Sequence, residues 1–114
     1  MIWLKVTGET NKKTYFYGET VTITGRVAAS FLKMVGIASA EVRLLRNVGL
    51  GAKWSKTIKT ANDGTFSFVD TASAWEEVDE TVDLVKANGI TYTLEATWSI
   101  LSDAKTLEKV SVTD

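Results

Sequence analysis

Apolar and polar residues alternate along several short stretches of this chain, which is the period of a β-strand with one buried face. In residues 20–27, Val21, Ile23 and Val27 share one face, while three threonines and an arginine share the other. The same alternation recurs at residues 2–6, 40–44, 53–59, 66–68, 92–98 and 110–112. The pattern predicts about seven short strands and therefore an all-β fold.

Polar and glycine-containing segments separate these stretches. The segment Asn62-Asp63-Gly64 predicts a hairpin turn, because Asp-Gly supplies the positive φ that a tight turn needs. We expect further turns at residues 47–51 and 103–105, and a polar connection at residues 8–14. Residues 28–39 are apolar at several positions but are interrupted by a glycine, which favours a loop with an apolar plug or a single helical turn.

One segment, residues 73–87, departs from the β period. Ser73 followed by Glu76 matches a capping box, which begins many helices. The apolar residues of the segment recur at helical spacing: Trp75, Val78, Val82 and Val85. Gly89 follows Asn88 as a typical C-terminal cap. The sequence thus predicts one short helix inserted between strands.

Length and composition are those of an ordinary globular protein. The chain has 114 residues, of which 45% are hydrophobic and 24% are charged. This length suits a single domain covering residues 1–114. Cysteine is absent, which excludes a disulfide scaffold. No apolar run approaches the roughly 18 residues of a membrane-spanning helix, so we expect no direct membrane insertion.

Charge is balanced overall but unevenly placed along the chain. The net charge of −1 argues against nucleic acid as a partner. Residues 1–60 hold ten Lys or Arg against three Glu, giving +7, whereas residues 61–114 hold three Lys against eleven Asp or Glu, giving −8. Either the strands of the two halves interleave and mix these charges, or the molecule has a basic end and an acidic end suited to head-to-tail contact.

Four fragments resemble domains of prokaryotic surface proteins at their glycine, turn and core positions. Residues 17–25 (YGETVTITG) are similar to the opening of immunoglobulin-like and macroglobulin-like modules. Residues 40–44 (AEVRL), 63–68 (DGTFSF) and 92–96 (YTLEA) are similar to carboxypeptidase-regulatory, or transthyretin-like, domains. The resemblance covers residues 15–113 and implies an antiparallel immunoglobulin-like or transthyretin-like sandwich.

Domains of these families are mostly non-catalytic spacers, adhesion modules or subunits of surface layers and filaments. The resemblance therefore implies a non-catalytic structural or adhesive module of a secreted or cell-surface protein, with a self-assembling surface-layer or filament subunit as one form of that role. The implied partners are other proteins or identical subunits, with glycans as further candidates. A carbohydrate-binding module is the alternative, because exposed tryptophan rings stack on sugars.

Catalysis has few candidate residues in this sequence. Histidine and cysteine are absent, which removes the commonest general base, the commonest reactive thiol and the usual zinc ligands. No spacing selects a pair of carboxylates for acid–base work. We therefore expect no enzymatic activity.

Calcium is the one metal ion that the sequence suggests. Five carboxylates fall within eight residues: Glu76, Glu77, Asp79, Glu80 and Asp83. Hard cations prefer such oxygen ligands, although the spacing does not match an EF-hand loop. The other interpretation is a solvated face of the predicted helix.

Three of the four tryptophans are in phase with predicted buried positions. Trp98 shares a face with the apolar residues of its strand, Trp75 shares the apolar face of the predicted helix, and Trp54 shares a face with Ile58. We expect Trp98 to belong to the core, Trp75 to anchor the predicted helix to the sandwich, and Trp54 to be at least partly buried.

Trp3 differs from the other tryptophans because it points away from Ile2, Leu4 and Val6. It is the leading contact candidate, together with Tyr15 and Tyr17, which follow soon after in the sequence. The alternative is that Trp3 covers a second small core.

The first strand is a candidate for exchange between copies of the chain. It is followed by the polar connection at residues 8–14, and both of its faces are partly apolar. Such a strand can pair with the sheet edge of a neighbouring molecule. The alternative is an ordinary first strand that pairs within its own domain.

Overall fold

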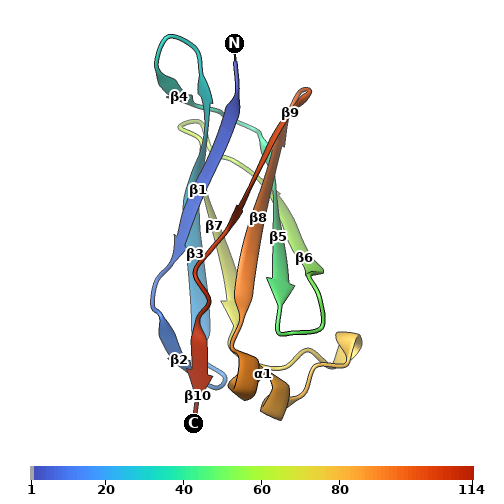
Figure 1. Ribbon diagram of the computed structural model, residues 1–114. Coiled ribbons are helices and arrows are strands. Elements are labelled where there is room, and N and C mark those ends of the chain that lie inside the picture. The colour runs from blue at the N-terminus through green and yellow to red at the C-terminus, as the bar shows by residue number, and fades with distance from the viewer. Residues whose placement is uncertain (1) are drawn as a thin grey trace.

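The chain folds as an all-β sandwich, as the alternation predicts (Figure 1). The computed structural model describes residues 2–114, without the side chains of Trp54 and Ser55. The partial burial expected for Trp54 therefore lies outside the described residues.

Two four-stranded sheets and a separate strand pair make up the sandwich. The first sheet contains β1 (Leu4–Thr10), β3 (Thr20–Ser30), β4 (Met34–Gly36) and β7 (Thr65–Thr71), with β3 at its centre. The second sheet has the order β6 (Lys53–Lys59), β5 (Glu41–Asn47), β8 (Thr91–Trp98) and β9 (Leu101–Thr106). The strands of both sheets pair in antiparallel fashion, whereas β2 (Thr14–Phe16) and β10 (Ser111–Thr113) pair in parallel.

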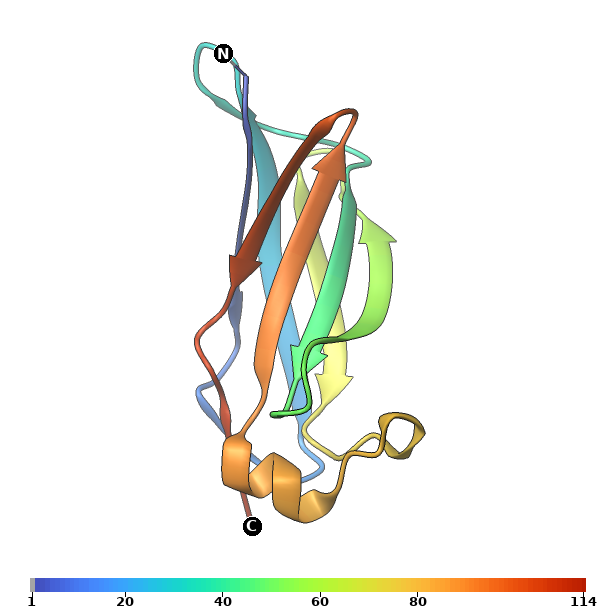
Figure 2. The same ribbon diagram turned by 45° about the vertical axis from the view of Figure 1, so that its right-hand side comes forward.

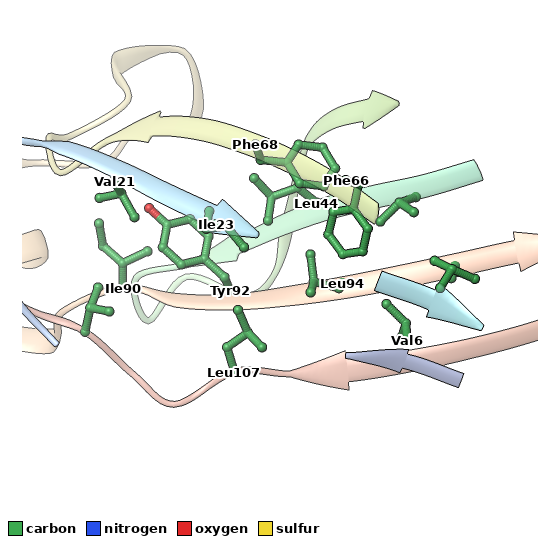
Figure 3. Packing of buried hydrophobic residues seen from close by; sticks show 14 of the residues in the cluster. Val6, Val21, Ile23, Leu44, Phe66, Phe68, Ile90, Tyr92, Leu94 and Leu107 are labelled. Carbon is green, nitrogen blue, oxygen red and sulfur yellow. The ribbon is translucent and has the colours of Figure 1, made fainter. Parts of the chain in front are cut away.

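The core lies between the two sheets, where their alternating apolar residues meet (Figure 3). Val21 and Ile23 enter the core from β3, Leu44 enters it from β5 and Leu94 from β8, and all four are fully buried. The threonines that alternate with Val21 and Ile23 lie on the outer face of β3. The half-buried character predicted for residues 20–27 is therefore confirmed.

Gly25 allows the strands at the centre of the first sheet to pack closely. A Cβ atom at this position would lie 2.1 Å from the Thr7 carbonyl oxygen and 2.4 Å from the Phe66 ring. Backbone and ring both occupy that space, so only glycine permits β1, β3 and Phe66 to approach this closely.

Three segments contain strands that the sequence pattern did not predict. β3 continues to Ser30 and returns as β4, so residues 28–39 hold a hairpin rather than a plugged loop or a helical turn. β9 includes residues 103–105, where a turn was expected, and the turn lies instead at Ser99 and Ile100. β1 continues to Thr10, which shortens the predicted polar connection at residues 8–14.

The predicted helix over residues 73–87 is also shorter than expected. A 3-10 turn occupies Glu76–Val78, and the α-helix α1 covers only Val82–Asn88. Thr81 is the N-cap, and its hydroxyl accepts a hydrogen bond from the Leu84 amide, so the predicted capping box at Ser73 does not begin the helix. The C-cap at Gly89 is confirmed, with a φ of 68°.

The molecule is elongated, with extents of 48, 22 and 18 Å. One end carries the N-terminus, the β3–β4 hairpin and the β8–β9 turn, and the other carries α1, β2 and β10 (Figures 1 and 2). No helix among the described residues is long and apolar enough to cross a bilayer.

Candidate functional site

Exposed apolar side chains gather at the end of the sandwich that carries the β3–β4 hairpin. We call this surface the apolar end, and it consists of Ile2, Trp3, Phe31, Leu32, Met34, Val35 and Ile100. Leu32 and Ile100 are the extreme members, since their exposed fractions are 106% and 95%. An exposed group of large apolar side chains at one place is a typical sign of an interaction surface.

The hairpin that carries Leu32 is held together by backbone hydrogen bonds. Ala28, Ala29 and Ser30 of β3 pair with Gly36, Val35 and Met34 of β4. At the tip, the Phe31 amide donates to the Lys33 carbonyl over 3.1 Å. Leu32 therefore projects from a hydrogen-bonded turn and not from an unstructured loop.

Two aromatic residues connect this hairpin to the second sheet. The ring of Phe31 packs edge to face on Trp98 of β8, with 6.4 Å between the ring centroids. Trp98 is half-buried against the core, as its phase predicted. Ile100 lies two residues beyond it, in the turn between β8 and β9. The two sheets thus contribute to one apolar surface.

Positive charge accompanies the apolar end. Lys33 lies at the hairpin tip, between Leu32 and Met34, and is exposed. Lys5 of β1 is also exposed and lines a small hollow of about 170 Å³ together with Met34. Residues 2–8, 28–40 and 98–102, which build this end, contain these two lysines and no carboxylate.

Carboxylates also border these segments: Asp103, Asp63 and the exposed Glu41 of β5, which pairs in register with Thr97 of β8. Asp103 of β9 accepts a hydrogen bond of 2.9 Å from the Val6 amide of β1. Asp63 accepts from both the amide and the hydroxyl of Thr65, and these bonds lower its pKa. Asp103 and Asp63 thus serve local structure, whereas Glu41 is exposed beside the apolar end.

A buried arginine lies toward the opposite end of the sandwich. Arg46 of β5 has no exposed surface, and its guanidinium contacts Asp70 at 2.7 Å and Glu80 at 2.8 Å. It also donates to the backbone carbonyls of Thr71, at 3.0 Å, and Ser73. This single side chain therefore holds three chain segments together.

Two aromatic residues complete the surroundings of Arg46. The hydroxyl of Tyr92 donates to Asp70 over 2.6 Å, and the Trp75 ring lies over the guanidinium with its centroid 4.6 Å away. Burial and the neighbouring Asp70 charge raise the pKa of Tyr92 far above its usual range. For Arg46, burial acts to lower the pKa, but the hydrogen bonds and charges of Glu80 and Asp70 outweigh it and raise the pKa.

The three predicted contact residues are not brought together. Trp3 is half-exposed at the apolar end, as its phase indicated. The prediction of Tyr15 as a contact residue is wrong, because its side chain is 1% exposed and its hydroxyl donates to Asn11 within the core region. Tyr17 packs partly against the core, and its hydroxyl accepts from the Ala74 amide. Both tyrosines lie at the end opposite Trp3, where β2 is located (Figure 1).

The five predicted calcium ligands do not converge either. Glu80 is buried and faces Arg46, whereas Glu76, Glu77, Asp79 and Asp83 are exposed. Within residues 2–114, no group of three or more carboxylates is arranged to hold a metal ion. The acidic segment is instead interrupted by Asp79, whose left-handed backbone ends the 3-10 turn.

Sequence reasoning missed the central members of both regions. Leu32 lay in a segment interpreted as a plug, and Ile100 was not singled out. Arg46 was assigned no role, although it occupies an inward position of β5, where a charged residue requires a partner. That phase was the one signal that could have revealed it.

Comparison with solved structures supports the fold. The sporulation control protein Spo0M from Bacillus subtilis aligns with a TM-score of 0.54 and 16% identity, over 98% of this chain and 50% of that one. The β-glucosidase EmGH1 from Erythrobacter marinus gives 0.52 and 10% over 94% of this chain, and a β-glucosidase from Listeria innocua gives 0.51 and 13% over 96%.

The chain spans half of Spo0M and 16% of each β-glucosidase. No protein-family model and no curated protein matches the sequence. At these identities the likeness shows a β-sandwich shared with domains of larger proteins.

Proposed function

We propose that this domain is a non-catalytic structural or adhesive module of a secreted or cell-surface protein, and that it makes its contacts through the apolar end. The observation that carries the proposal is the full exposure of Leu32 and Ile100 on two neighbouring turns of a rigid sandwich. Large apolar side chains kept in water lower the solubility of a protein, so such a group is expected where a partner covers it.

The sequence supports the same role. The fragments at residues 17–25 and 63–68 resemble surface modules that act as spacers, adhesins or filament subunits. Identical subunits and other proteins remain the proposed partners on that basis. The position of the apolar end at one tip of a molecule 48 Å long also suits a spacer that holds a contact surface away from its attachment point.

The proposal is tested by retention on defined surfaces. Sensors carrying immobilised copies of the domain, a set of polysaccharides or a lipid bilayer are exposed to the wild type and to the Leu32→Ser/Ile100→Ser double variant. We expect the wild type to be retained on a protein or lipid surface and the double variant to be lost from it. Equal retention of both proteins, or no retention of either on any surface, would contradict the proposal.

A carbohydrate-binding module is the second candidate, because the first sheet has an open groove. The groove has a volume of about 980 Å³ and is lined by residues of β1, β3 and β7 and by residues 58–61, among them Glu9, Arg26 and Lys59. Retention on polysaccharide that survives the double variant, together with quenching of tryptophan fluorescence by the glycan, would favour this function.

A further inference from the structure

We propose that the apolar end binds the surface of an anionic lipid bilayer, with Leu32 and Ile100 entering the acyl boundary and Lys5 and Lys33 at the level of the phosphates. This inference deepens the proposed function and rests on it, because it names the partner of the same surface. It is drawn from the shape, the chemistry and the charge of that end.

The shape of the apolar end favours a deformable partner. Leu32 and Ile100 are each at the tip of a two-stranded hairpin, and both are almost fully exposed. A protein partner would need two matching pockets to bury two protruding tips. A bilayer closes around any protruding apolar group, so each side chain contributes its burial separately.

The aromatic residues occupy the next layer back from the tips. Trp3 is 52% exposed and adjoins the hairpin, since its carbonyl accepts from the Ser30 amide over 3.0 Å. Phe31 lies beside the tip residue Leu32 and rests against Trp98. Tryptophan favours the headgroup level of membranes, where an apolar ring and a polar N–H are both satisfied.

One exposed acidic segment lies far from the lysines of the apolar end. Lys33 lies at the hairpin tip and Lys5 lies on β1 beside Met34, while the exposed Glu41 and the bonded Asp103 border the same end. The exposed acidic residues Glu76, Glu77 and Asp83 belong to the segment of α1 at the other end (Figure 2). The molecule is 48 Å long, several times the Debye length of about 8 Å, so anionic lipids attract the lysines without repelling the acidic segment.

The area of the apolar end argues against a second copy as the partner. Extents of 22 by 18 Å give a cross-section of about 400 Å², whereas a stable protein interface buries roughly 800 Å² on each partner. An end-to-end dimer would also bring the Lys33 side chains of the two copies close together. Both considerations favour the bilayer.

The sequence predicts no direct membrane insertion because it contains no uninterrupted apolar run of about 18 residues. That criterion detects spanning helices. It does not detect a surface that the fold assembles from residues 2–3, 31–35 and 100.

Flotation with lipid vesicles tests this inference. The wild type is mixed with vesicles of phosphatidylcholine alone or of phosphatidylcholine and phosphatidylglycerol in equal parts, and the bound fraction is measured at low and high salt. We expect binding to the anionic vesicles and weaker binding to the neutral ones. Added salt should lower the bound fraction on anionic vesicles toward that on neutral vesicles and leave the latter unchanged, because salt screens the lysines and not the apolar contact.

Variants separate the apolar and the ionic contributions. Leu32→Ser/Ile100→Ser should lower affinity for anionic vesicles at least tenfold, because two exposed side chains lose their burial in the acyl boundary. Lys33→Gln should lower it about fivefold on anionic vesicles and leave neutral vesicles unaffected. Val69→Ser is the matched control, since Val69 is 52% exposed on β7, outside the apolar end, and should change nothing.

The flotation and retention assays together can contradict the bilayer proposal and the proposed function separately. Circular dichroism melting first establishes that each variant is folded. Wild-type protein that does not float, or a double variant that floats as well as the wild type, overturns the bilayer proposal. If the wild type is nevertheless retained on immobilised copies and the double variant is not, the domain is a contact module whose partner is a protein. If the wild type neither floats with vesicles nor is retained on immobilised copies, the proposed function is contradicted as well.

Discussion

The two ends of this sandwich place their polar and apolar groups in opposite ways. Toward the α1 end, charged Arg46, Asp70 and Glu80 are buried within the protein. At the apolar end, Leu32 and Ile100 are left in solvent. Each arrangement reverses the usual distribution of residues between core and surface.

The two ends differ in how much their residues contribute to the stability of the fold. The buried charges contact each other across β5, β7 and the segment before α1, so removing one leaves the others without compensation. The exposed tips contact little of their own protein, so replacing them costs the fold almost nothing. The α1 end is therefore a determinant of stability, and the apolar end is available for binding.

The largest effect is expected from Arg46→Ala. The substitution leaves Asp70 and Glu80 buried without their cation, which should lower the free energy of unfolding by about 3–5 kcal/mol. Denaturant unfolding monitored by fluorescence measures the loss. Arg43→Ala is the control, because Arg43 forms an exposed pair with Glu95 at 3.8 Å and should cost less than about 1 kcal/mol. Similar losses in the two variants would refute the distinction between the ends.

Tyr92→Phe should have the next largest effect. It removes the hydroxyl that donates to Asp70 over 2.6 Å, at a cost of about 1–3 kcal/mol, because the carboxylate stays buried with one partner fewer. The same unfolding experiment measures it. A loss below about 0.5 kcal/mol would mean that Arg46 alone satisfies Asp70.

The pH dependence of unfolding above pH 10 tests the environment of Tyr92 independently. Its pKa is raised above the ordinary value of 10.0, so it favours the folded state below pH 10 and this contribution is lost as the pH rises further. We expect Tyr92→Phe to reduce the steepness of unfolding above pH 10. An unchanged alkaline slope would contradict the burial of an un-ionised tyrosine.

A smaller effect concerns Glu19, close to β2 at the α1 end. A hydrogen bond from Lys12, followed by one from the Phe16 amide, lowers its pKa below the ordinary 4.5. A lowered pKa favours the folded state above pH 4.5, and this contribution is lost as the pH falls through the folded value. Lys12→Ala should raise the pKa of Glu19 toward 4.5 in an NMR titration, while that of Asp63 stays unchanged.

The smallest effect on stability is expected at the apolar end. Leu32→Ser/Ile100→Ser should change the free energy of unfolding by less than about 0.5 kcal/mol, because both side chains are already exposed to water in the folded protein. Thermal melting checks this against the wild type. A clear destabilisation would show that the tips contribute to folding and would weaken the comparison.

Periodicity predicted the sandwich because alternation reports directly on one buried face. Val21 and Ile23 were assigned to the core and are buried there. The β3–β4 hairpin was missed because its strand residues, Met34 and Val35, are apolar and exposed on both faces, so they do not alternate. β9 was missed because its middle, Ser102 to Lys105, is mostly polar and exposed.

The helix was overextended for a different reason. The spacing of Trp75 and Val78 is helical, but Glu80 is drawn to Arg46 of β5, a contact between distant segments that local spacing cannot show. The candidate site depends on such contacts even more, since the segments that carry Trp3, Leu32 and Ile100 reach the same end of the sandwich only through the topology of the two sheets.

The parallel pair β2–β10 lies on the path that mechanical tension would take through the domain. The two termini lie at opposite ends of the long axis (Figure 1), so force applied at Ile2 and Asp114 acts along the strands. It would draw β2 toward one end through β1 and β10 toward the other. Strands paired in parallel and pulled in opposite directions are sheared, so the hydrogen bonds that join residues 14–16 to residues 111–113 are loaded together rather than opened one by one. Extension would therefore be resisted by this short pair together with the β1–β3 ladder, which comes first on the path from Ile2.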